Sequence, residues 1–102
     1  MNIYILRKNK STWGIDGECY INNQKICDTV EHPTQHRTPG KWNINRENKK
    51  HFFVLGNGPM KNINGEICVG TFALKGFVLN SAKHYWKLQK RINKALNNNE
   101  EI

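Results

Sequence analysis

Three cysteines are the most reactive residues of this sequence, because a thiolate can act as a nucleophile or as a metal ligand. Cys19, Cys27 and Cys68 form no Cys-x-x-Cys pair, so we expect no structural zinc site, no other metal and no cofactor. Their odd number and sparse use favour a reducing compartment, and we expect the protein in the cytoplasm. Cys68 stands between Ile67 and Val69, a setting typical of a core residue.

Catalysis by Cys68 would require a base close to its thiol. Residues two apart on a strand point to one face, so Glu66 and Cys68 would share a side of the sheet. His51 begins the apolar stretch that ends at Leu55, and a neighbouring strand there would bring an imidazole towards the thiol. Glu66, Cys68 and His51 are therefore the catalytic candidates, against the simpler expectation that Cys68 is buried.

The glycine-rich stretch 56–59 (GNGP) is a second candidate site, because backbone amides in such a loop can bind an anion. The proline-bounded stretch 31–39 (EHPTQHRTP) is a predicted loop whose polar side chains would line a cleft beside it. The ligand-binding candidates are His36, Arg37, Gly56, Asn57, Gly58 and Glu66. A tight turn next to a solvated loop is the favoured interpretation.

The C-terminal segment changes to a helical period. Apolar residues recur at three- and four-residue steps at Tyr85, Leu88, Ile92, Ala95 and Leu96. This predicts an amphipathic helix over about 81–97, with Ser81 as its N-cap and a frayed tail at 98–102. The opposite face is basic, and its nucleic-acid-binding candidates are Lys83, Lys87, Lys90, Arg91 and Lys94. A solvated helix face is the favoured interpretation.

The remainder of the chain has the apolar and β-branched pattern of short strands. Strands are predicted at 3–8, 18–21, 25–30, 40–44, 51–55 and 66–69. Asp16-Gly17 is a predicted turn, and a three-residue loop at 22–24 would place Cys19 opposite Cys27 as two free thiols or a bridge. The stretch 71–79 is predicted as loop and extended structure. Together these elements predict an α+β fold, a small curved antiparallel sheet or barrel-like core covered by one C-terminal amphipathic helix.

Length and composition limit the remaining possibilities. The 102 residues suit one domain, 1–102, and the longest apolar run of four residues is far too short to cross a membrane. The N-terminal stretch lacks a signal-peptide pattern and is interpreted as mature sequence. The net charge of +8 would attract nucleic acid, but 15 asparagines and many lysines also suggest a simple compositional bias.

Four short motifs follow one another along nearly the whole chain, at 17–21 (GECYI), 26–31 (ICDTVE), 38–42 (TPGKW) and 65–70 (GEICVG). Their order resembles a small uncharacterised domain family of phages and bacteria, whose members look like shortened relatives of the L,D-transpeptidase fold. In that fold a His and a Cys attack peptidoglycan stem peptides through a thioester. The resemblance implies a phage or mobile-element protein whose partner is a peptidoglycan fragment or a host or phage protein.

The chain departs from the family pattern at both reactive positions. Where the pattern has Gly-Cys-Ile, the sequence has Gly65-Glu66-Ile67, and where it has His-x-Gly-Asn, Val54 replaces the histidine. Glutamate cannot form a thioester and valine cannot accept a proton, so the family mechanism is lost. We therefore expect a non-catalytic binding protein. A divergent cysteine-type transferase or hydrolase of peptidoglycan peptides and a nucleic-acid or nucleotide binder are the alternatives.

Overall fold

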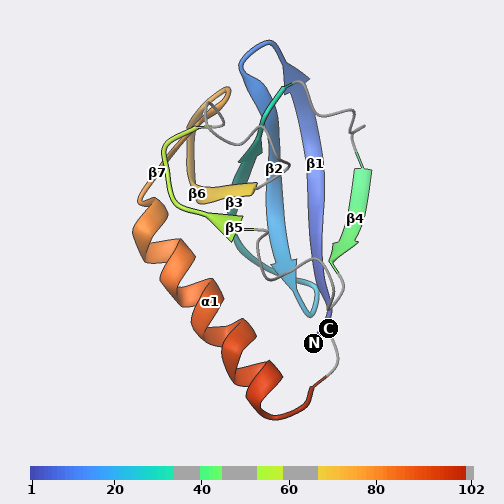
Figure 1. The fold of residues 1–102 in the computed structure, drawn as a ribbon. Helices are drawn as coiled ribbons and strands as arrows, with labels where there is room; N and C mark the ends of the chain where they lie inside the picture. Colours follow the sequence, from blue (N-terminus) through green and yellow to red (C-terminus); the bar gives the residue numbers. More distant parts are fainter. Residues whose placement is uncertain (34–39, 45–52, 59–66, 101–102) are drawn as a thin grey trace.

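The computed structural model describes residues 1–33, 40–44, 53–58 and 67–100, which form a curved sheet with one helix at the C-terminal end (Figure 1). The elements are β1 (Ile3–Ser11), β2 (Gly14–Ile21), β3 (Gln24–Glu31), β4 (Gly40–Ile44), β5 (Phe53–Val54), β6 (Ile67–Leu74), β7 (Phe77–Leu79) and α1 (Ser81–Asn97). The predicted α+β class is confirmed. The strand order β4-β1-β2-β3-β6-β5 leaves the described sheet open, with β7 paired to β6 off this path.

The central hairpin, β2 and β3, is antiparallel and brings two cysteines face to face. Its turn has two residues, Asn22 and Asn23, with φ angles of 51° and 66°, and not the predicted three. A bulge in β3 restores the register, so Cys19 still pairs with Cys27. Both thiols are free and buried, and the hydrogen bond between them together with burial raises the pKa of Cys27.

The turn predicted at Asp16-Gly17 is wrong, because both residues lie inside β2 and the chain reverses at Thr12 and Trp13. Packing explains the glycine. A Cβ at Gly17 would lie 2.7 Å from the carbonyl oxygen of Leu6 and 2.9 Å from Oγ1 of Thr29. Gly17 therefore allows close approach of neighbouring strands and does not form a turn.

The segment 71–79, predicted as loop and extended structure, is extended and forms a hairpin from the second half of β6 and β7. The first half of β6 pairs antiparallel with β3 and parallel with β5, an exception to the predicted antiparallel sheet. The hairpin folds back over the outer face of β2, where the amide of Gly76 donates to Asp16 Oδ1 at 3.0 Å. A Cβ at Gly76 would overlap the carbonyl oxygen of Trp13, so the hairpin tip rests directly on the β1–β2 turn.

Helix α1 packs against β3 and β6 through the predicted apolar stripe (Figure 1). Leu88, Ile92 and Ala95 are buried, and burial of a leucine or isoleucine side chain contributes about 1.5–3 kcal/mol. The stripe joins the main core, whose sheet residues are Ile3, Ile5, Cys19, Ile21, Cys27, Phe53, Ile67 and Val69. No helix in the described part of the chain has the length and apolar character that spanning a bilayer requires.

Ser81 is not the N-cap that the sequence predicts. The cap position is Asn80, which adopts a left-handed conformation with φ 56° and makes no side-chain capping hydrogen bond. Ser81 is the first helical residue, and its hydroxyl oxygen accepts a hydrogen bond from the amide of Gly56 at 3.1 Å. The serine therefore connects the helix to the chain that leaves β5.

Candidate functional site

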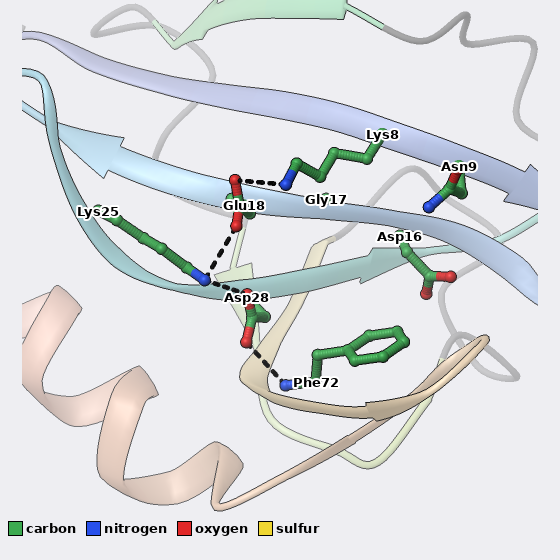
Figure 2. Close-up of a pocket in the computed structure, with 8 residues that line it drawn as sticks. All are labelled: Lys8, Asn9, Asp16, Gly17, Glu18, Lys25, Asp28 and Phe72. Carbon is green, nitrogen blue, oxygen red and sulfur yellow. Dashed lines mark hydrogen bonds and ion pairs between the residues drawn. The ribbon is translucent and has the colours of Figure 1, made fainter.

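A hollow of about 310 Å³ lies between the outer face of β1–β3 and the β6–β7 hairpin, and we call it the groove (Figure 2). Alternation along β2 puts Asp16 and Glu18 on this outer face, and the folded-back hairpin supplies Phe72. The groove is lined by Lys8, Asn9, Asp16, Gly17, Glu18, Lys25, Asp28 and Phe72. Three of the eight acidic residues of this basic protein are gathered here.

Two lysines neutralise two of the three groove carboxylates. Lys25 Nζ lies 2.9 Å from both Glu18 Oε2 and Asp28 Oδ1, and Figure 2 shows it reaching between them. Lys8 Nζ lies 3.2 Å from Glu18 Oε1, which also accepts from the hydroxyl of Tyr20 at 3.0 Å. The backbone amide of Phe72 donates to Asp28 Oδ2 at 2.8 Å. Glu18 and Asp28 therefore have hydrogen-bond partners at all four carboxylate oxygens.

This network changes the protonation of its members. The hydrogen bond from Lys25 holds the pKa of Glu18 below its ordinary value, with further lowering from Tyr20 and Lys8. The hydrogen bonds to Asp28 and Glu18 raise the pKa of Lys25. Glu18 is thus held ionised and Lys25 is held protonated, so this end of the groove keeps its mixed charge over a wide pH range.

Asp16 differs from the other two groove carboxylates. Its Oδ1 accepts from the Gly76 amide, but Oδ2 is buried and has no hydrogen-bond partner among the described residues. The residue is 6% exposed. An unsatisfied buried carboxylate oxygen costs free energy in the folded protein, and a hydrogen-bond donor brought to it would recover that cost. Half-exposed Phe72 lies close to Asp16 in the close-up and provides an apolar wall (Figure 2).

The catalytic candidate Cys68 lies in β6 with no exposed surface. It packs in a small second core with Val30, Val78 and Val54. Burial raises the pKa of its thiol more than a hydrogen bond with Ser81 lowers it. Cys68 is therefore a buried thiol held in its protonated form, which is the opposite of what a nucleophile needs.

The glycine-rich loop candidate is described for Gly56, Asn57 and Gly58, and three of its polar groups are engaged within the fold. The Gly56 amide donates to Ser81, the carbonyl of Asn57 accepts from the Val78 amide at 2.7 Å, and the Asn57 side chain donates to the Val78 carbonyl at 3.1 Å. The loop therefore attaches β5 to β7 and α1, and its Gly56 amide is already used by Ser81.

The other predicted residues divide into two groups. His36, Arg37, His51 and Glu66 lie outside the described residues. Lys83, Lys87, Lys90 and Lys94 are exposed on α1, and Arg91 is half-buried there. Within the described ranges, no three His, Cys, Asp or Glu side chains are arranged to hold a metal ion. The chain matches no protein-family model, no curated protein and no solved structure.

Sequence reasoning missed the groove, although one signal was present. Lys8, Asp16 and Glu18 sit at positions that alternate with apolar core residues on two adjacent strands, which places them on one polar face. That pattern is equally typical of an ordinary solvated sheet face. Phe72 and Gly76 turn the face into a groove, and they come from much further along the chain, Gly76 lying 60 residues beyond its partner Asp16.

Proposed function

We propose that the protein is a non-catalytic binding protein whose groove holds an amino acid or a peptide end with a free ammonium group. The observation that carries this proposal is Oδ2 of Asp16, which is buried and has no partner among the described residues, at a groove whose other two carboxylates are satisfied. A charged donor is the chemical complement of that oxygen. Because Oδ2 has almost no accessible surface, binding requires that the side chains around it move aside.

The two groove lysines favour a ligand that carries a carboxylate as well. Lys8 and Lys25 are 52% and 46% exposed, so each ammonium can contact a ligand carboxylate while keeping its protein partner. A free amino acid carries both charges within a few ångströms, whereas a peptide end carries both only where a charged side chain supplies the second one. The family resemblance suggests one source of such a ligand, the stem peptides of peptidoglycan, whose amine and carboxylate groups fit a site of mixed charge.

The burial of Cys68 supports the non-catalytic part of the proposal. A thiol with no exposed surface and a raised pKa is not available to attack a peptide carbonyl. The free, facing thiols of Cys19 and Cys27 support residence in a reducing compartment such as the cytoplasm.

The groove is tested by NMR titration of the isotope-labelled protein with L-lysine, cadaverine, glutarate and a peptidoglycan stem peptide. We expect the amide signal of Gly76, which is bonded to Asp16, to shift with lysine and with the stem peptide, to shift less with cadaverine, and to stay fixed with glutarate. Asp16→Asn keeps the oxygen that accepts from Gly76 and should weaken lysine binding at least about tenfold. Glu100→Gln, far along the chain on an exposed residue, is the matched control.

Two outcomes would contradict the proposal. If no amine shifts the Gly76 signal, or if Asp16→Asn binds lysine as well as the natural protein does, the groove is not an ammonium site.

The cysteine-enzyme alternative is tested separately with iodoacetamide. We expect all three cysteines to react far more slowly than a free thiol in the native protein and to react fully in urea, whereas rapid labelling of native Cys68, or a covalent adduct with a stem peptide, would favour an enzyme.

A further inference from the structure

The outward face of α1 has a composition unlike the rest of the molecule. The helix contains four lysines and one arginine and no Asp or Glu. Within the described ranges, none of these five basic residues takes part in an ion pair, whereas Lys8 and Lys25 of the sheet are both paired. The helix therefore presents a concentrated positive charge with no counter-charge of its own.

One large aromatic side chain lies within this basic face. Trp86 is 62% exposed, and helical spacing puts it on the same face as Lys83, Lys90 and Lys94. Its indole meets the half-buried Tyr85 ring edge to face at 5.0 Å and 84°, a contact that favours one orientation of the exposed ring. A shallow hollow beside it is lined by Trp86, Gln89, Lys90, Asn93, Lys94, Asn97 and Asn98.

We infer that this face of α1 binds single-stranded nucleic acid, with the lysines contacting phosphates and an unpaired base stacking on Trp86. Basic grooves with aromatic platforms are the usual means of binding single strands without sequence preference, and Asn93 and Asn97 add donors and acceptors beside the ring. The stretch from Lys83 to Lys94 covers about 16 Å of the helix axis, room for more than one phosphate.

Charge and shape favour a single strand over the other polyanions. A base inside a duplex shows no open face to an indole, so Trp86 would add nothing to duplex binding. An anionic membrane surface attracts helices whose apolar side is free. In α1, which is described throughout, the apolar stripe is packed on the sheet and Trp86 is the exposed large apolar side chain. This inference does not depend on the groove.

The test is fluorescence anisotropy of the full chain with labelled oligo(dT), a duplex of the same length and vesicles containing anionic lipid, at 50 and 200 mM salt. We expect oligo(dT) to bind with a steep loss of affinity as salt rises and to bind more tightly than the duplex or the vesicles.

Trp86→Ala should weaken oligo(dT) binding about tenfold with an unchanged salt slope. Lys90→Ala with Lys94→Ala should reduce the slope by about 1.4, the value for two lost phosphate contacts on a single strand.

Matched controls separate the helix face from general surface effects. Trp13 is equally exposed, at 68%, but lies at the β1–β2 turn, and Lys75 is exposed on the hairpin, so Trp13→Ala and Lys75→Ala should bind as the natural protein does. Circular dichroism confirms that each variant is folded. The inference is wrong if oligo(dT) does not bind at 50 mM salt, if Trp86→Ala and Trp13→Ala weaken binding equally, or if the duplex or the vesicles bind as tightly as oligo(dT).

Discussion

The sheet and the helix use their charges in opposite ways. On the sheet, Lys8 and Lys25 are paired with acidic side chains, and Arg7 is paired with Glu31 on the other face. On α1, five basic residues have no acidic neighbour on the helix. The difference shows that the net charge of +8 says little about function until each charge is located, because paired lysines stabilise the fold while unpaired ones are available to a partner.

The most deeply buried pair lies on the helix side of the sheet. The Nε and Nη2 atoms of Arg7 donate to the two carboxylate oxygens of Glu31 at 2.8 and 3.0 Å, and the residues are 7% and 0% exposed. A guanidinium and a carboxylate that meet in this forked geometry fix both strands laterally. The pair joins β1 to β3 across the intervening strand β2.

The largest effect is expected where charge is most buried. Glu31→Gln removes the carboxylate that the buried guanidinium of Arg7 faces, and we expect the free energy of unfolding to fall by about 3 kcal/mol or more. Urea denaturation measures it. Glu100→Gln, which breaks the ion pair between exposed Glu100 and the N-terminal amine, is the control and should cost less than about 1 kcal/mol. If both variants lose the same free energy of unfolding, burial does not make the Arg7–Glu31 pair more important for stability than the pair at Glu100.

A moderate effect is expected in the groove. Lys25→Met leaves Glu18 and Asp28 facing each other without the cation between them, and should lower the free energy of unfolding by about 1 kcal/mol. Lys90→Met on α1 should change it by less than about 0.5 kcal/mol, because methionine and lysine have similar helix propensities and α1 contains no acidic residue that could pair with Lys90. If the two variants lose the same stability, the contrast between paired and unpaired lysines is wrong.

The smallest effect concerns acid. Because the folded-state pKa of Glu18 is below its unfolded value of about 4.3, ionised Glu18 stabilises the fold above that pH, and the contribution is lost as the pH falls through the lower folded value. Urea denaturation gives the free energy of unfolding at each pH from 6 to 2.5. This free energy should fall less steeply with acid for Glu18→Gln than for the natural protein, and the two falls should differ by less than about 1 kcal/mol. Identical pH profiles would mean that the ionised Glu18 side chain does not stabilise the fold.

Local patterns predicted the elements that depend on neighbouring residues. The three- and four-residue spacing of Leu88, Ile92 and Ala95 reports directly on a helix face, and these residues are buried as predicted. The pairing of Cys19 with Cys27 was also predicted correctly, although a two-residue turn plus a bulge replaces the three-residue loop. One extra residue in β3 compensates for the shorter turn, so Cys19 faces Cys27 in the observed hairpin as it would with a three-residue loop.

The failures come from contacts between distant segments. Asp16-Gly17 has the composition of a turn, but β1, β3 and the hairpin hold it extended, with Asp16 bonded to Gly76 and Gly17 pressed between strands. Serine is a residue type that often caps helices, but the hydroxyl of Ser81 accepts a hydrogen bond from the Gly56 amide instead. The groove needs the same long-range folding of the hairpin, so neither its shape nor the unpartnered oxygen of Asp16 was visible in the sequence.

Gly76 has a consequence for how the molecule tolerates change. At the hairpin tip, the backbone of Gly76 packs against the backbone of Trp13 in the β1–β2 turn. This backbone contact sets the distance between the β6–β7 hairpin and the outer face of the sheet. Any larger residue at this position would act as a spacer and lift the hairpin, and the same displacement would pull the amide away from Asp16 and widen the entrance beside Phe72. The width of the groove entrance and the docking of the hairpin are therefore adjusted together, through one position that has no side chain to vary.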